Sequence, residues 1–375
     1  MGQSPYRKDF EYPPGQGYFN TGAEGLLLKT CARSFEDYLR AKGIGAEGRP
    51  QLYEKGQECK SGIARLLGVS AKEIAVVSNA SEAINRLCNS IPWNPGRDEV
   101  VINDLEFPSN VLPWLRLQKR GVKVRIVRNR NWHVVPEDFE REINDNTRLV
   151  SVSHVSYMTG SRLDIQEIGR MAHSVGAIYS VDATQSLGRI PIPMECIDYL
   201  VASTYKWLIS PHGGGVVFCS RDLLDSFEPE AVGWWSVADI FRADRFERYE
   251  LKSDASRLEL GMPGFPVLYG ISDAVAYLNE VGISRIEQDL QPVSDFLIEE
   301  VSKLKVELMT PLPQTQRAGL VSFLHPDCMR IAEELSGEGI QVWGGDRRVR
   351  ISVHLYNDRS EVETLVKLLR EKVRL

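Results

Sequence analysis

The sequence predicts an α/β fold, with a large domain built on a mostly parallel seven-stranded sheet and a small α+β domain at the C-terminus. Before about Pro266, short runs rich in Val and Ile alternate with segments of helical periodicity. Most of these runs are apolar throughout, which is typical of parallel strands covered by helices on both faces. After Pro266, long helical segments follow one another with few strands between them. The second part of the chain is therefore expected to form a separate, smaller unit.

Each element of the large domain is expected where a stretch of strand-like or helix-like residue pattern is bounded by turn-forming residues. The strands are expected at 74–78, 99–103, 123–127, 148–153, 177–182, 198–203 and 215–219. Helices are expected at 81–89, 108–119 and 165–174. Ligands of an open α/β sheet bind at the carboxyl ends of its strands, so the residues that follow each strand are the candidates for function.

The small domain is expected to contain helices at 271–281, 286–304 and 361–370 and strands at 319–323 and 349–353. The segment Gly261-Met262-Pro263-Gly264 interrupts the pattern just before this region. We therefore expect residues 1–19 to form an N-terminal segment, residues 20–266 the large domain and residues 267–375 the small domain.

The composition argues against several classes of protein. The 375 residues include 45 Lys and Arg against 51 Asp and Glu, a net charge of −6, and 43% of them are hydrophobic. Such a chain is too apolar to be disordered and lacks the basic excess of most nucleic-acid-binding proteins. No apolar run approaches the ~18 residues of a membrane-spanning helix. Six cysteines without a C-x-x-C pair indicate buried thiols rather than a disulfide framework. We expect a cytoplasmic protein without a nucleic-acid, membrane or metal partner.

Two charged residues stand at the carboxyl ends of predicted strands. Asp182 ends strand 177–182, and Lys206 follows strand 198–203 after Ser203-Thr204-Tyr205. One crossover separates the two strands, so both side chains can face one cleft. A structural ion pair at the edge of the sheet explains the same pattern equally well.

A third feature is the segment Ser78-Asn79-Ala80-Ser81, which opens the helix after strand 74–78. The free N–H groups of a first helical turn bind anions, although an ordinary helix cap at Asn79 or Ser81 has the same sequence pattern. One arrangement accounts for all three features. It has a phosphate at Ala80 and Ser81, an aldehyde on Lys206 and a ring cation beside Asp182, which is the arrangement of pyridoxal phosphate (PLP).

The chain resembles the class V aminotransferases, a PLP-dependent family that includes cysteine desulfurases, kynureninase-like and epimerase-like enzymes. Five motifs carry the resemblance in the order expected for the family. They are Tyr18-Phe19-Asn20-Thr21-Gly22, Val181-Asp182-Ala183-Thr184-Gln185, Ser203-Thr204-Tyr205-Lys206-Trp207 with Pro211-His212-Gly213-Gly214-Gly215, Leu258-Glu259-Leu260-Gly261-Met262-Pro263, and Arg350-Ile351-Ser352 with Tyr356-Asn357. The resemblance runs from Tyr18 to the last helix and implies PLP fold type I.

The resemblance also implies roles for individual residues. Lys206 would hold PLP as a Schiff base, Asp182 would pair with the pyridinium nitrogen, and Gln185 would bind the ring hydroxyl. The phosphate would be held by Ala80, Ser81, Ser203 and Tyr205.

On the substrate side, Phe107 falls where the family places a ring-stacking residue, often His, although it also fits a simple core position. Tyr157 falls where an Asn often touches the substrate. Arg350 would clamp the substrate α-carboxylate, because a guanidinium can bind a carboxylate in two places. The opening segment with Asn20 would lie near the substrate, so residues 1–19 are expected to pack near the active site.

The sequence departs from the family pattern at two places. The loop 337–349, where desulfurases carry a mobile cysteine, has none, and Cys328 is the last cysteine before Arg350. A desulfurase that forms a persulfide on this loop is therefore not expected. Met262 replaces the Thr that touches the phosphate from the partner subunit, so one phosphate contact is expected to be missing. Trp234, Trp235 and Trp343 fit either an aromatic substrate pocket or the core and dimer interface.

The resemblance predicts a homodimeric PLP enzyme that acts on a small α-amino acid through an external aldimine and an α-carbanion. We expect an aminotransferase or a C–S lyase, with an epimerase or a desulfurase-like lyase as alternatives. A non-catalytic scaffold with this fold is a third alternative, and the set of Lys206, Asp182 and Arg350 argues against it. A nucleotide-binding oxidoreductase would need G-x-G-x-x-G after the first strand, and residues 78–82 do not contain it.

Overall fold

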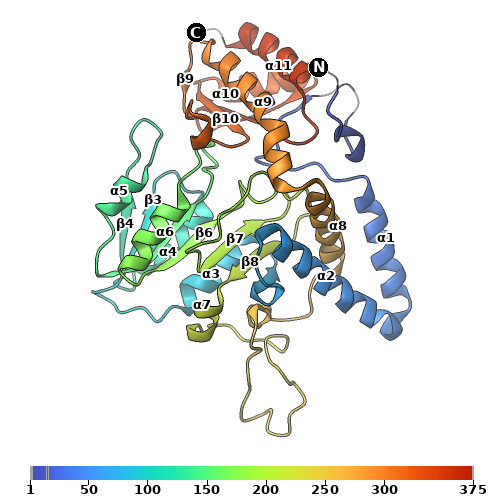
Figure 1. The fold of residues 1–375 in the computed structure, drawn as a ribbon, viewed down its shortest axis with the longest axis vertical. Helices are drawn as coiled ribbons and strands as arrows, with labels where there is room; N and C mark the ends of the chain where they lie inside the picture. Colours follow the sequence, from blue (N-terminus) through green and yellow to red (C-terminus); the bar gives the residue numbers. More distant parts are fainter. Residues whose placement is uncertain (1–2, 14, 16, 374–375) are drawn as a thin grey trace.

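The computed structural model describes residues 3–13, 15 and 17–373, and its centre is a seven-stranded sheet (Figure 1). The strand order is β2-β8-β7-β6-β5-β3-β4, and only β8 runs antiparallel to its neighbours. The bounds are β2 (Ile74–Val77), β3 (Glu99–Asn103), β4 (Lys123–Val127), β5 (Thr147–Ser153), β6 (Ile178–Asp182), β7 (Tyr199–Ser203) and β8 (Gly215–Cys219). The prediction of a mostly parallel seven-stranded sheet is therefore confirmed.

Two apolar cores lie on the two faces of this sheet. Neighbouring residues of a strand enter different cores, as Leu200 and Val201 do, because successive side chains point to opposite faces. One face is covered by α3 (Ala80–Ser90) and α4 (Leu112–Gln118). The other is covered by α2 (Arg49–Leu67), α6 (Ile165–Ser174) and α8 (Phe265–Val281). Three short or peripheral helices complete this part, namely α1 (Thr30–Gly43), α5 (Pro136–Glu140) and α7 (Arg221–Ser226).

The helices differ from the expectation in several places, and α8 begins six residues before the expected start at 271. The helix expected at 108–119 is divided into a 3-10 turn, Pro108–Asn110, and α4, because Val111 leaves the helical region at φ −123° and Pro113 lacks an N–H donor. The expected elements also do not include α1 and α2, or the short helices α5 and α7. Helices α1 and α2 both pack against α8, and a Cβ at Gly62 would lie only 2.6 Å from Val275 Cγ2.

The C-terminal part holds a second, four-stranded sheet in the order β12-β13-β10-β9. Its strands are β9 (Glu307–Leu308), β10 (Leu320–Leu324), β12 (Trp343–Gly345) and β13 (Arg348–Ser352), all antiparallel to their neighbours. It is accompanied by α9 (Ile283–Ser302), α10 (Cys328–Gly337) and α11 (Arg359–Lys372). Figure 1 shows this part at the top, with both ends of the chain beside it.

The N-terminal segment lies against the C-terminal part. Within it, β1 (Gly17–Tyr18) pairs with β11 (Ile340–Gln341), and Arg7 forms ion pairs with Asp358 and Glu361. Residues 1, 2, 14 and 16 of the segment lie outside the described residues. The division at residues 19 and 266 remains a proposal. The second point lies within the first turn of α8, and this helix packs on α1 and α2 of the large domain.

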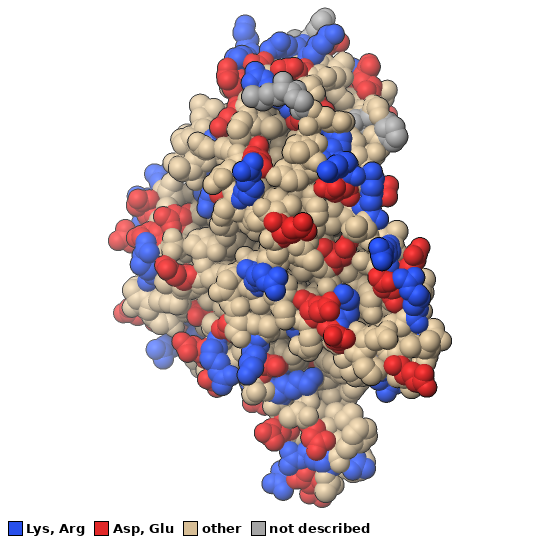
Figure 2. Space-filling model, turned by 45° about the vertical axis from the view of Figure 1, so that its right-hand side comes forward, with Lys and Arg blue, Asp and Glu red and all other residues tan. Residues whose placement is uncertain are grey.

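The segment between α7 and α8 projects from the body as a long arm (Figure 1). It exposes the aromatic side chains of Phe241 and Phe246, which are 80% and 88% exposed. On the face drawn in Figure 2, basic and acidic side chains are interspersed and form no continuous basic stripe. Among the described residues, the helices are too short or too polar to cross a membrane.

Candidate active site

A cavity of about 350 Å³ lies at the carboxyl ends of the central strands and at the first turn of α3. Nine of the eleven residues predicted for the site line it. They are Ala80, Ser81, Phe107, Tyr157, Asp182, Gln185, Ser203, Tyr205 and Lys206. The fold thus brings strand ends and loops from separate parts of the chain to one place, as expected for an open α/β sheet.

Lys206 lies in this cavity just after β7 and is only 8% exposed. Burial lowers the pKa of its ammonium group to about 8, and the nearby charge of Arg350 acts in the same direction. Asp182 and Glu24 oppose this shift. A larger fraction of the amine is therefore neutral near physiological pH than for an ordinary lysine, and a neutral amine can attack an aldehyde.

Asp182 ends β6 and lines the same cavity. Its Oδ1 atom accepts a hydrogen bond from the Thr184 N–H at 2.8 Å. Burial raises the pKa of the carboxyl group, and the hydrogen bonds from Thr184 and the charge of Lys206 oppose this shift. A buried carboxylate of this kind favours a bound cation, such as a protonated ring nitrogen.

Gln185 is held in one orientation by two neighbours. Its Oε1 atom accepts the indole N–H of Trp207 at 2.7 Å, and its Nε2 atom donates to the Gly22 carbonyl at 2.9 Å. An amide nitrogen carries two hydrogens, so one donor remains for a ligand. The amide therefore fits the ring hydroxyl of PLP.

The first turn of α3 forms another wall of the cavity. Asn79 caps the helix by accepting the Glu82 N–H at 2.8 Å, and the amides of Ala80 and Ser81 belong to the turn that lacks intrahelical acceptors. The hydroxyl groups of Ser81 and Ser109 lie 2.6 Å apart. Burial raises the pKa of Tyr205, which keeps its hydroxyl group neutral. These N–H and O–H donors fit a phosphate group.

Phe107 and Tyr157, from the loops after β3 and β5, line the cavity next to each other. Their rings meet edge to face with centroids 5.0 Å apart, and Lys206 Nζ lies 5.5 Å from the centroid of Phe107. Phe107 is 41% exposed, so it is not part of the core. A phenyl ring can stack on a planar ligand but cannot transfer a proton.

Arg350 and Asn20 are the two predicted residues that do not line the cavity. Arg350 Nη1 donates to the Tyr157 carbonyl at 3.0 Å, and Arg350 Nε is buried without a hydrogen-bond partner in the described chain. Burial and the charge of Arg348 lower the pKa of Arg350 to about 10. A buried guanidinium that has a free Nε donor and no carboxylate partner among the described residues fits an incoming carboxylate. Asn20 forms a bridge with Ser352, two residues after Arg350.

Four residues that line the cavity are not among the residues predicted from the sequence. They are Asn79, Ser109, Ser153 and Thr184. Thr184 Oγ1 accepts the Ser203 N–H at 3.0 Å and so joins the ends of two strands. The motif that contains Asp182 and Gln185 already includes Thr184. The contribution of Ser109 and Ser153 depends on packing between distant segments, for which the sequence carries no local signal.

The tryptophans and cysteines singled out earlier lie outside the cavity lining. Trp235 Nε1 donates to Glu259 at 3.1 Å, whereas the Trp343 ring lies 4.7 Å from the Arg348 guanidinium and 5.0 Å from that of Arg350. Cys328 is buried at the start of α10, and the backbone of β12 packs directly on it.

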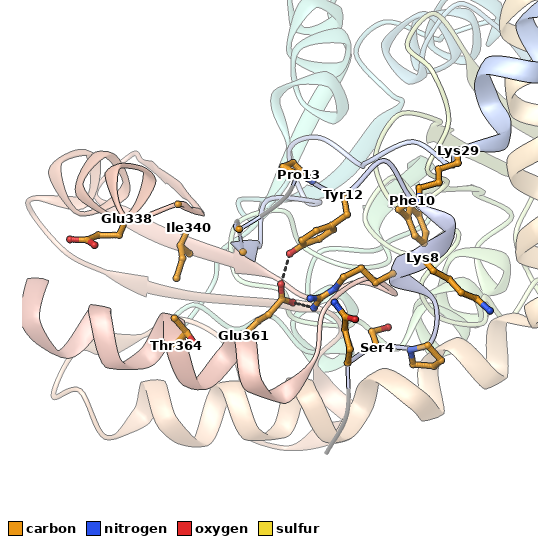
Figure 3. A pocket seen from close by; sticks show the side chains of 16 residues that line it. Ser4, Lys8, Phe10, Tyr12, Pro13, Lys29, Glu338, Ile340, Glu361 and Thr364 are labelled. Carbon is orange, nitrogen blue, oxygen red and sulfur yellow. Dashed lines mark hydrogen bonds and ion pairs between the residues drawn. The ribbon is translucent and has the colours of Figure 1, made fainter.

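A larger cavity of about 790 Å³ lies between the N-terminal segment and the C-terminal part (Figure 3). Figure 3 shows the Tyr12 hydroxyl directed at Glu361, which also pairs with Arg7. These charged side chains already neutralise one another, and none of the predicted site residues lines this cavity. The smaller cavity therefore remains the candidate active site.

Comparisons with known proteins agree with this choice. The family profile described as aminotransferase class-V matches residues 38–365. A probable cysteine desulfurase of Methanothermobacter thermautotrophicus is 31% identical over 370 residues, covering 92% of this chain and 90% of that protein. The apo structure of a cysteine desulfurase from Thermococcus onnurineus has a TM-score of 0.90 at 27% identity and covers 100% of this chain and 99% of that one. A structure of C-DES with glycine covalently linked to its PLP cofactor has a TM-score of 0.88 over 98% of this chain and 99% of its own, and at 23% identity it shows the fold alone.

Proposed function

Because the chain belongs to the class V aminotransferase family of PLP-dependent, fold type I enzymes, we propose that it cleaves the C–S bond of a small cysteine-derived α-amino acid. The sulfur is released from the enzyme as part of a small-molecule product and is not transferred to a cysteine of the enzyme. One observation carries this proposal: Lys206 and Asp182 line a cavity that no cysteine lines, and Arg350, whose Nε is buried without a partner among the described residues, is hydrogen-bonded to Tyr157 in its wall.

The roles of the residues follow from their positions. Arg350 binds the substrate α-carboxylate, and Phe107 and Tyr157 confine the substrate above the strand ends. When bound, PLP supplies an electron sink for the charge that develops at the α-carbon. Lys206, released from the cofactor, accepts the α-proton. The C–S bond then breaks with its electron pair on sulfur.

The cysteines of the chain do not offer a second acceptor for sulfur. All six lie in the described part of the chain and none lines the cavity. Burial raises the pKa of Cys31 to about 11, of Cys59 to about 12 and of Cys88 to about 11, which removes their reactive thiolate form. No cysteine of the cavity lining therefore replaces the cysteine that is missing from 337–349.

Two further parts of the proposal concern the assembly and its location. The arm between α7 and α8 exposes large aromatic side chains, and Met262 is 47% exposed near the first turn of α3. A second copy of this chain would cover such apolar surface, so we propose a homodimer. Six free thiols fit a reducing compartment, which supports a cytoplasmic location.

The experiment is product analysis with the PLP-loaded protein. L-cysteine, L-cystine and other small α-amino acids are supplied with and without an α-keto acid, and pyruvate, ammonia and sulfide are measured. We expect pyruvate and ammonia in equal amounts without the keto acid, and no sulfur bound to the protein by mass spectrometry. Lys206→Ala should lower the rate by at least about 10³-fold, since it removes the proton acceptor.

Lys252→Ala is the matched control, because burial also lowers the pKa of Lys252 but this lysine lines a different cavity. Its rate should stay near that of the wild type. Turnover that requires the keto acid and releases no ammonia would identify a transaminase. Formation of alanine with sulfur on a cysteine of the chain would identify a desulfurase of the persulfide type.

A further inference from the structure

Glu106 is a buried carboxylate that the proposed reaction does not use. It follows β3, is 5% exposed and precedes Phe107. Four hydrogen bonds point at its two oxygens. The donors are Asn103 Nδ2 at 2.5 Å, Asn110 Nδ2 at 2.8 Å, the Ser153 N–H at 2.7 Å and the Ser153 hydroxyl. A carboxylate that receives four donors is arranged as an acceptor, which is the role of its ionised form.

Ser153 connects Glu106 to the floor of the cavity. Ser153 lies opposite Asp182 in the parallel pairing of β5 with β6, so the two side chains stand next to each other on the same face of the sheet. Ser153 and Asp182 both line the cavity. The hydroxyl and amide that Glu106 accepts therefore belong to the immediate neighbour of Asp182.

The charges around Glu106 are few. No ion pair joins it to a lysine or arginine of the described chain, although a buried carboxylate is costly without one. Burial and the charge of Asp182 raise its pKa to about 7, and the donors from Ser153 and Asn110 oppose this shift. The phenol of Tyr179, also on β6, has a pKa far above its usual value and stays neutral. Asp182 is thus the charged group that faces Glu106.

We propose that Glu106 is a positioning residue that places a second negative charge beside Asp182 and thereby favours the protonated form of the lysine-bound cofactor. A negative charge near a bound cation stabilises that cation, and in a buried site the effect is weakly screened. This inference rests on the proposed function, because it requires PLP attached to Lys206. It also gives a reason for keeping an acid where an uncharged residue would cost less.

The test is a spectrophotometric pH titration of the PLP-loaded protein, which needs no substrate. The pH midpoint of the change in the cofactor band is measured for the wild type and for Glu106→Gln. We expect the midpoint of Glu106→Gln to lie about 0.5 to 1 pH unit lower, since one charge is removed from a partly buried position. Glu106→Asp keeps the charge and should lie closer to the wild type.

Ser151→Ala is the matched control. Its hydroxyl donates to Asn110 Oδ1 in the same buried network but carries no charge, so the midpoint should not move. An unchanged midpoint in Glu106→Gln overturns the proposal, as does an equal shift in Ser151→Ala. If Glu106→Gln does not fold, Asn110→Ala takes its place. Loss of this donor favours the neutral form of Glu106, so the midpoint should also fall, and no shift overturns the proposal. A wild type without a titrating band would instead count against the proposed function.

Discussion

The two sides of the candidate active site differ in whether their polar side chains have hydrogen-bond partners within the chain. On the side of the central sheet, Gln185, Thr184 and Glu106 all have hydrogen-bond partners within the chain. On the side of the small sheet, Arg348 Nε and Arg350 Nε are buried without partners in the described residues. Buried donors without partners cost free energy, about 1–3 kcal/mol each. The sheet side is therefore held in place by hydrogen bonds within the chain, whereas these two Nε donors have no partner among the described residues.

The two arginines on the side of the small sheet differ in their ion-pair partners. Arg348 pairs with Asp346, whereas Arg350 forms no ion pair with a described carboxylate. The Arg350 guanidinium donates to the Tyr157 carbonyl and lies against the Trp343 ring. This difference supports the proposal that Arg350, rather than Arg348, binds the substrate carboxylate.

Replacing Arg350 should weaken substrate binding while the protein still binds PLP. We expect Arg350→Gln to lower kcat/KM by about 10²-fold, mainly through a higher KM, because a charge-assisted pair with the substrate carboxylate is lost. Steady-state kinetics and PLP titration check this. Arg348→Lys, which can keep its pair with Asp346, should change KM far less. An unchanged KM in Arg350→Gln would remove the distinction between the two sides.

The second prediction concerns the effect of the Arg350 charge, on the substrate side, on the pKa of Lys206, on the cofactor side. The rate at which PLP attaches to the apo protein should rise about tenfold per pH unit and level off above about pH 8, where Lys206 is neutral. Arg350→Gln removes a positive charge, so the pKa of Lys206 should rise and the midpoint should move to higher pH. Stopped-flow absorbance measures it.

Asp182→Asn should shift the pH midpoint of PLP attachment in the opposite direction. The carboxylate of Asp182 raises the pKa of Lys206, so its removal should move the midpoint to lower pH. Shifts of both variants in one direction would contradict the assignment of the two charges.

The smallest effect is expected at Trp343, whose ring contacts both arginines. Trp343→Leu should raise KM by about two- to fivefold, since a cation–π contact is worth about 0.5–1 kcal/mol. Trp234→Leu is the control, because that side chain is 47% exposed and does not contact either arginine. Equal KM values for the wild type and Trp343→Leu would show that Trp343 does not hold Arg350 in place.

Much of the large domain could be predicted from the sequence. The bounds of β3, β4 and β8 agree with the expected ranges, and Lys206, Asp182 and Gln185 meet in one cavity. Continuous apolar runs carry a strong signal for buried parallel strands. By contrast, α1 and α2 are more polar amphipathic helices whose packing on α8 is a long-range property.

The ends of the strands and the ionisable residues that follow them are predictable from the sequence, because they depend on local periodicity and on the direction of each strand. Which groups share a charge environment follows instead from the packing of the folded chain. Glu106 and Asp182 are distant in the chain, and the β5–β6 pairing through Ser153 makes them neighbours. Electrostatic effects depend on distance and burial, and both are set by packing between segments that have no local signal for one another.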